Sequence, residues 1–143
     1  MIPVLISIEA SAWRDDMPDA GSLQIMVPGE MELATDGLQT VLHYEETIDE
    51  DAAPQQVTVT VRDHAVSVVQ DGDYESQMYF KKDFRYQSVY STPAGDMDMS
   101  IFCTSLKDHF DETGGLLDIH YQLDLNGKFA AMHEMRMQVV TQK

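Results

Sequence analysis

The sequence predicts an all-β fold, a closed antiparallel up-and-down barrel of about 8–10 strands. Apolar and polar residues alternate with a period of two, and short turn signals such as Asp-Gly and Asn-Gly separate the alternating runs. No layer of amphipathic helices is available to cover such a sheet, so closing the sheet on itself removes its exposed edges. A β-sandwich is the alternative. The clearest run alternates Leu117, Ile119, Tyr121, Leu123 and Leu125 with Asp118, His120, Gln122 and Asp124.

About ten strands follow from this pattern, and their short connections predict an antiparallel meander. The predicted strands cover residues 2–11, 30–35, 38–46, 56–62, 65–70, 75–80, 84–92, 95–104, 115–125 and 128–139. The chain of 143 residues is too short for two independent cores, so residues 1–143 are expected to form a single domain.

One helix is predicted, over residues 105–112. Ser105 and Asp108 have the spacing of a capping box, in which each side chain satisfies a free backbone N–H of the first turn. Leu106 and Phe110 lie four residues apart, which places them on one face of a helix.

The predicted pairing of two hairpins rests on keeping the apolar faces together. A two-residue turn at Asp63 and His64 sets Val61 opposite Val66 and leaves the valine face intact. For the last hairpin, a two-residue turn would set the leucine face against the other face of the final strand. A three-residue loop over 125–127 is therefore predicted, with Gly127 left-handed in a G1 bulge, which sets Leu123 opposite Phe129.

The charge of the chain limits its partners. Nine Lys and Arg stand against 25 Asp and Glu, a formal charge of −16, and 43% hydrophobic content is enough for a globular core. Nucleic acids and anionic membrane surfaces are disfavoured, because both bind through Lys and Arg. Residues 1–51 hold 12 of the acids against Arg14 alone, which indicates either solvated loops, an acidic docking surface for a basic protein, or a halophilic source.

The single cysteine, Cys103, cannot form an intramolecular disulfide, and it lies in an alternating apolar run where a thiol is a small buried hydrophobe. A reducing, cytoplasmic compartment is the simplest interpretation. The apolar run 2–8 is predicted to be a strand, because no basic region precedes it. No stretch approaches the roughly 18 apolar residues of a membrane helix.

A series of short motifs, in a particular order, resembles a known family. The motifs are Gly29-Glu30, Tyr44-Glu45-Glu46, Gln77-Met78-Tyr79-Phe80, Tyr90-Ser91-Thr92-Pro93-Ala94-Gly95, Thr104, Gly115 and Tyr121-Gln122-Leu123. The resemblance covers roughly residues 29–140 and is to the YwiB-like family of uncharacterised bacterial proteins, a domain of unknown function. It implies a calycin-like or lipocalin-like barrel, a bacterial cytoplasmic setting and no established activity, so no catalytic residue is transferred. Compared with this family, segment 12–28 is expected to be a lengthened first loop.

Strand alternation places a group of aromatic, sulfur-containing and polar side chains inside the predicted barrel. His133 faces inward among apolar neighbours, so burial is expected to lower its pKa and keep it neutral. It is either a core histidine satisfied by a protein group or a polar anchor for a ligand. The candidate ligand-binding residues are Tyr86, Tyr90, Met97, Met99, Tyr121, His133 and Met135.

Other chemistry has little support in the sequence. The five histidines lack the spacing of a zinc motif, so no metal site is predicted, and no catalytic residue is assigned. There is no Gly-x-Ser-x-Gly elbow and no glycine-rich phosphate loop, and no cofactor is expected. Enzymatic activity stays open, although no acid–base or nucleophile set points to it.

Two functions from different classes follow. The first is a barrel that binds a small apolar or amphipathic ligand in its interior, which predicts an internal cavity. The second is a protein-interaction module with a filled barrel and an acidic docking surface for a basic partner, which predicts salt-sensitive association.

Overall fold

The computed structural model describes the chain except residues 15–16, 48–53, 72–75, 93–94 and 143. The side chains of residues 14, 17–21 and 90–92 also lie outside that description. The described residues form ten strands, which confirms the all-β prediction. They are β1 (Ile2–Arg14), β2 (Met17–Leu33), β3 (Gln39–Glu46), β4 (Gln55–Arg62), β5 (Ala65–Asp71), β6 (Ser76–Lys81), β7 (Arg85–Thr92), β8 (Gly95–Asp111), β9 (Gly114–Leu125) and β10 (Lys128–Thr141).

The strands form one antiparallel sheet in the order β6-β5-β4-β3-β2-β1-β10-β9-β8-β7. Its two edges, β6 and β7, follow each other in the chain. The connection between them is tied to β8, since the Asp83 N–H donates to the Cys103 carbonyl at 2.8 Å. The rings of Tyr79 on β6 and Tyr86 on β7 lie 6.1 Å apart. The sheet is therefore a nearly closed barrel, as the sequence predicts.

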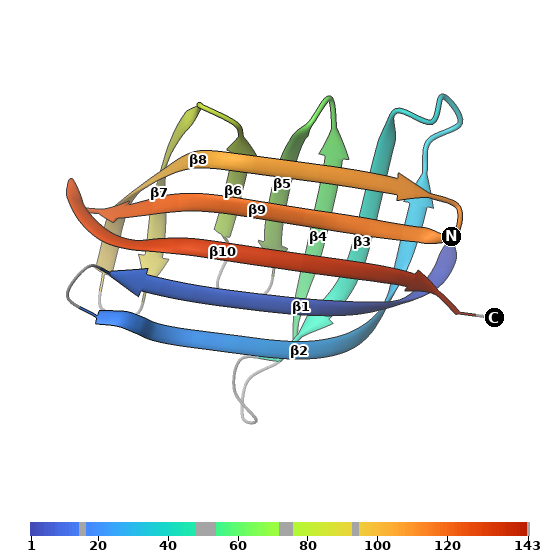
Figure 1. The fold of residues 1–143 in the computed structure, drawn as a ribbon, viewed down its shortest axis with the longest axis horizontal. Helices are drawn as coiled ribbons and strands as arrows, with labels where there is room; N and C mark the ends of the chain where they lie inside the picture. The colour runs from blue at the N-terminus through green and yellow to red at the C-terminus, as the bar shows by residue number, and fades with distance from the viewer. Residues whose placement is uncertain (15–16, 48–53, 72–75, 93–94, 143) are drawn as a thin grey trace.

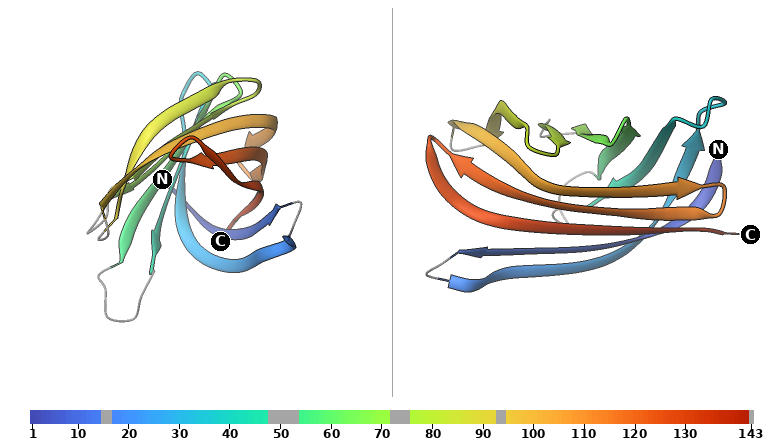
Figure 2. Two further views of the ribbon diagram at one scale, coloured as in Figure 1. Left: turned by 90° about the vertical axis from the view of Figure 1, so that its left-hand side faces the viewer. Right: turned by 45° about the horizontal axis from the view of Figure 1, so that its top comes forward.

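The barrel wall has two groups of strands that face each other. Figure 1 shows β8, β9, β10, β1 and β2 running across the view, in front of β3 to β7. Long strands join the two groups into one sheet: β2 pairs with β1 as far as Met31 and with β3 from Gly29 onward. Figure 2 shows how β2 and the strands β8 to β10 curve around the interior. Because the sheet is continuous, the two groups are not the separate sheets of a sandwich.

Apolar side chains from both groups pack against each other in the core. The hydrophobic contribution of burying one such side chain is about 1.5–3 kcal/mol, before the entropy of ordering it is subtracted. The valine face of β4 and β5 is intact, because Val61 pairs with Val66 across a two-residue turn, as predicted. Those turn residues, Asp63 and His64, have φ of +54° and +59°. Side chains with no exposed surface include Val4, Ile6, Met31, Leu42, Val59, Val66, Phe80, Ile101, Leu117 and Ile119.

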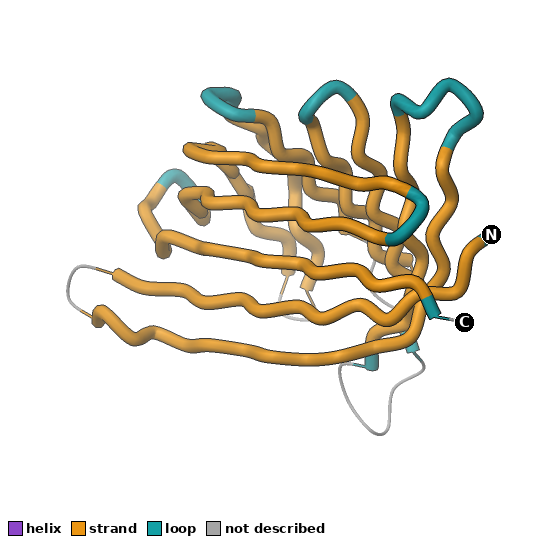
Figure 3. The backbone as a smooth tube through the Cα atoms, turned by 45° about the vertical axis from the view of Figure 1, so that its right-hand side comes forward, coloured by secondary structure: helices purple, strands orange, loops and turns teal. Residues whose placement is uncertain are grey.

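The predicted helix over residues 105–112 is wrong. Strand β8 continues to Asp111, and Figure 3 shows strands and turns but no helix in the described chain. The four-residue spacing of Leu106 and Phe110 fits both structures, because an even spacing also puts two residues on one face of a strand. A bulge between Cys103 and Ser105 turns Leu106 toward the core. The described residues contain no helix long and apolar enough to cross a membrane.

The expected long loop over 12–28 is also wrong. Strand β1 reaches Arg14 and β2 begins at Met17, so most of this segment is strand. Pro18 and Pro28 weaken the strand signal in this part of the sequence, because proline cannot donate a ladder hydrogen bond. Both prolines lie outside the β2–β3 ladder, which begins at Gly29, so this part of β2 is an edge where proline is tolerated.

The predicted loop of the last hairpin is corrected in its length. Lys128 pairs with Leu125, so the turn contains two residues, Asn126 at φ +52° and Gly127 at φ +77°. Gly127 is left-handed, as predicted. The extra residue lies further along, in a bulge at Ala130, after which Ala131 pairs with Leu123. A shift of one residue in the pairing is needed to keep the apolar faces of β9 and β10 together. The bulge in β10 provides this shift.

Candidate functional site

Four adjacent strands, β7 to β10, carry the predicted interior residues. Met99 is buried at 7% exposure, while Tyr86, Tyr121 and Met135 are half-buried and pack against the core. Met97 is half-buried, two residues before Met99 on the same face of β8. Tyr90, the remaining tyrosine of the set, pairs with Met97 through its backbone, but its side chain lies outside the described residues.

The centre of this group is a stack of rings that crosses the barrel. Phe80 on β6 lies 4.9 Å from Tyr121 on β9, with 56° between the ring planes. Tyr121 lies 4.9 Å from His133 on β10, with 6° between the planes. The last pair is fixed by the ladder, where His133 and Tyr121 are directly opposite. The stack therefore links one edge strand of the sheet to the middle of the opposite group.

The polar atoms of this stack lack protein partners within the described part of the chain. Neither the Tyr121 hydroxyl nor an imidazole nitrogen of His133 makes a hydrogen bond there. Burial raises the pKa of Tyr121 to about 12 and lowers the pKa of His133, so both groups are neutral at pH 7. A neutral imidazole offers one donor and one acceptor, and a phenol offers both roles.

A second inward-facing polar group, which sequence reasoning missed, lies at the ends of β3, β5 and β6. The Gln70 Nε2 donates to Glu46 Oε2 at 3.0 Å, and the Ser76 hydroxyl donates to Gln70 Oε1 at 2.9 Å. Burial, together with the charge of Glu46, raises the pKa of Tyr44. Strand parity could have found this group, because Gln70 follows Val66 and Val68 on the same face.

An open depression of about 380 Å³ lies at the seam between the two edges of the sheet. Gln70 and Ser76 line it from one side and Ser88 from the other, and its remaining lining is exposed: Val69, Asp71, Gln77 and Val89. None of the predicted residues lines this depression, although Tyr86 precedes Ser88 by two positions on the same face of β7. Residues from both faces of the strands at the seam therefore line the depression.

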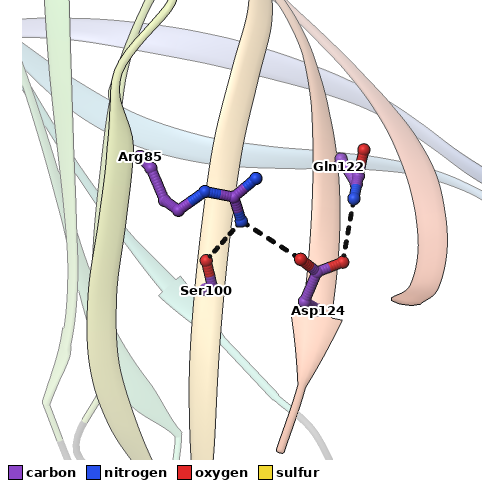
Figure 4. A network of polar contacts seen from close by, with 4 residues as sticks. All are labelled: Arg85, Ser100, Gln122 and Asp124. Carbon is purple, nitrogen blue, oxygen red and sulfur yellow. Dashed lines mark hydrogen bonds and ion pairs between the residues drawn. The ribbon is translucent and has the colours of Figure 1, made fainter. Parts of the chain in front are cut away.

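Polar contacts on the outer face hold the strands that carry the site, as Figure 4 shows. The Arg85 Nη1 donates to Ser100 Oγ at 2.8 Å and to Asp124 Oδ2 at 3.1 Å, which ties β7 to β8 and β9. The Gln122 Nε2 donates to the other oxygen of Asp124 at 3.0 Å. The Arg85 guanidinium also lies 5.3 Å from the centroid of the Phe102 ring.

Cys103 is buried on the inner face of β8. Its thiol donates to the Ser105 carbonyl at 3.4 Å, and burial raises its pKa. Because the thiolate is the nucleophilic form, a raised pKa is the opposite of what a reactive cysteine needs. The thiol is a packing group here.

Comparison with known proteins places the chain in a family without giving it an activity. A family model described as a domain of unknown function, DUF1934, matches residues 6–137. The crystal structure of the ywiB protein from Bacillus subtilis is similar, with a TM-score of 0.83 at 18% identity over 99% of this chain and 93% of that one. At such identity the likeness shows the fold. No curated protein matches the chain.

Proposed function

The chain belongs to the DUF1934 family of domains of unknown function, and from this premise we propose that its barrel binds one small apolar or amphipathic molecule. In this proposal the ligand lies against the inner faces of β7 to β10. Its contacts are the side chains of Tyr86, Met97, Met99, Tyr121, His133 and Met135, with Tyr90 added by the alternation of β7.

The observation that carries the proposal is the unpaired polar pair inside the barrel. Tyr121 and His133 stack on each other, and neither makes a hydrogen bond within the described chain. Both side chains are only half-buried, and neither contributes an atom to those that the described chain shields from water and leaves without a hydrogen bond, so water can satisfy them in the free protein. A ligand with one hydroxyl, carbonyl or amide satisfies both groups, because each can donate and accept.

The apolar neighbours support a ligand that is mostly hydrocarbon. Three methionines lie on the inner faces of the two strands that flank β9: Met97 and Met99 on β8, and Met135 on β10. Methionine side chains adapt to irregular shapes because they are flexible and polarizable. They suit a surface that must pack well both with and without a ligand.

The seam between β6 and β7 supports an entrance for such a ligand. Its open depression of about 380 Å³ falls within the roughly 300–1,000 Å³ typical of small-molecule sites. Ser88 in this depression and Tyr86 share the inner face of β7, so a molecule that enters there meets Tyr86, one of the proposed contacts, next.

The acidic charge favours a second candidate, a module that docks a basic protein. A net charge of −16 attracts a cationic surface over about 8–10 Å at physiological salt. In that case association weakens as salt rises, and the barrel interior stays filled by its own side chains.

A cytoplasmic location is part of the proposal. Cys103, which has no partner cysteine in the sequence, is a buried free thiol. A reducing compartment preserves such a thiol.

The direct test is binding of Nile red, an uncharged apolar dye that the negative chain does not repel. We expect wild type to bind the dye and increase its emission, and Met135→Trp to reduce the binding severalfold by filling the site. Gln138→Trp is the matched control, because Gln138 is exposed on the same strand. His133→Leu tests the site without adding volume, in case Met135→Trp disturbs the fold. Equal emission from wild type, Met135→Trp and His133→Leu would overturn the proposal.

A further inference from the structure

Three potential metal ligands meet on the outer face of β9 and β10, away from the ring stack. Asp118 and His120 are two residues apart on one face of β9. Glu134 lies on β10 and pairs directly with His120. The ladder fixes the backbone of all three. The sequence alone predicts no metal site here, because an acid and a histidine two residues apart are common and Glu134 joins them only through the pairing.

The spacing of the ligand atoms matches a zinc coordination sphere. The Nε2 of His120 lies 3.3 Å from Asp118 Oδ1 and 3.5 Å from Glu134 Oε1. All three ligand atoms lie within 4.8 Å of one another. Nitrogen and oxygen ligands bound to Zn²⁺ at about 2.0–2.1 Å in a tetrahedron are about 3.3–3.4 Å apart. Two of the three separations are therefore close to the required length, and the third, between the two carboxylate oxygens, is no more than 4.8 Å.

One oxygen of this group is shielded from solvent and has no hydrogen bond. Asp118 Oδ1 has no donor partner in the described chain, although its side chain is only 22% exposed. A carboxylate oxygen shielded from water in this way is unfavourable unless a cation is near. The His120 Nε2 lies 3.3 Å away but does not form a hydrogen bond with it. A bound metal ion satisfies it directly.

No neighbouring lysine or arginine side chain forms an ion pair with Asp118 among the described contacts. The two neighbours are Lys107 and Arg136, which the ladder places opposite Asp118. The two carboxylates contribute a charge of −2 to the group, and an imidazole that binds a metal ion does so as the neutral ring. We propose that Asp118, His120 and Glu134 bind a divalent transition-metal ion, with Zn²⁺ as the best match to one imidazole and two carboxylates.

The proposed ion retains a position for an exchangeable ligand. Three protein ligands leave the fourth position of a tetrahedron to water or to a bound molecule. Glu134 also borders a groove of about 410 Å³ on the same face, where it lies with Arg136, Ser11 and Ser22. The open position of the ion is therefore next to a groove that holds a cationic side chain and two hydroxyls.

The competing account is an imidazolium that forms ion pairs with both carboxylates and needs no metal. Titration of Zn²⁺ into tag-free, chelator-treated protein, followed by calorimetry, separates the two. We expect one Zn²⁺ per chain, and binding at least tenfold weaker in His120→Ala and in Glu134→Gln. Glu134→Gln keeps the shape of the side chain, which makes it informative if His120→Ala disturbs the fold.

Matched controls come from exposed residues outside the cluster. His109→Ala removes an exposed histidine of β8, and Glu32→Gln removes an exposed carboxylate of β2, so both should bind Zn²⁺ as wild type does. Co²⁺ in place of Zn²⁺ should give the visible absorption of a tetrahedral complex. The proposal is overturned if wild type takes up no stoichiometric Zn²⁺, or if His120→Ala binds Zn²⁺ as tightly as wild type. Ring signals of His120 that respond to pH but not to Zn²⁺ would show the imidazolium account to be the correct one.

Discussion

The imidazole of His133 lies parallel to the ring of Tyr121, with 4.9 Å between centroids and 6° between planes. The two residues are directly opposite in the β9–β10 ladder. Their stacking excludes water from one face of each ring, which is consistent with the lowered pKa of His133 and the raised pKa of Tyr121.

The lowered pKa of His133 makes stability depend on pH. The unfolded chain binds the proton at about pH 6.5, whereas the folded chain resists it until a lower pH. Stability is therefore complete above the unfolded pKa and declines as pH falls from there toward the folded pKa. We expect His133→Phe, which keeps an aromatic ring on Tyr121, to lose less stability than wild type between about pH 7.5 and about pH 5.5. Urea unfolding at both values measures this, and parallel losses would contradict burial of the ring.

His64 is expected to have the opposite effect in the same pH range. Its Nδ1 lies 2.8 Å from Asp108 Oδ1, and that contact raises the pKa of the exposed imidazole. Stabilisation by the charged form is complete below the unfolded pKa of about 6.5 and is lost as pH rises through the folded pKa. His64→Asn retains a residue that accepts φ of +59° but removes the titration. Its stability relative to wild type should therefore rise with pH, as urea titrations can show. A difference that does not change with pH would exclude the linkage.

Gly127→Val should destabilise the protein by about 1–3 kcal/mol, because a β-branched residue is strained at φ of +77°. The control is Lys128→Val at the next position, which is exposed and in the strand. Chemical denaturation of both variants gives the comparison. Equal stability would mean that the turn does not require a left-handed residue there.

Deleting Ala130 should leave the fold in place. This residue is the bulge of β10, and the pairs on both sides of it stay matched when it is removed, because Phe129 keeps Asp124 and Ala131 keeps Leu123. Deleting Gln138 instead shifts the pairing by one and exchanges inward and outward faces. Amide spectra by NMR should be native for the first variant and disrupted for the second. A disrupted spectrum from the Ala130 deletion would show that the bulge itself is needed.

Local pattern predicts most of this fold because strand parity is a short-range property. The alternation of Leu117 to Leu125 and the two-residue turn at Asp63 both follow from neighbours in sequence. The Leu106 and Phe110 spacing does not distinguish strand from helix, and only the pairing of β8 with β9 decides between them. Pro18 and Pro28 weaken the strand signal of β2 for a similar reason, since their tolerance depends on which part of β2 is an edge.

The site is predicted less completely because it depends on long-range register. Parity alone places His133 and Tyr121 inside, but their stacking requires the bulge at Ala130 to set the pairing. Glu134 meets His120 only through the same register. The depression at the seam depends on the position of the two sheet edges, which no local pattern specifies.

A native mass spectrum tests the central claim of an interior binding site most directly. The protein should be measured as purified, after chelator treatment to remove metal, and again with excess Nile red. We predict a single organic molecule per chain in one or both spectra, released on denaturation and absent from Met135→Trp but retained by Gln138→Trp. A wild-type mass equal to that of the bare chain under both conditions would contradict the claim.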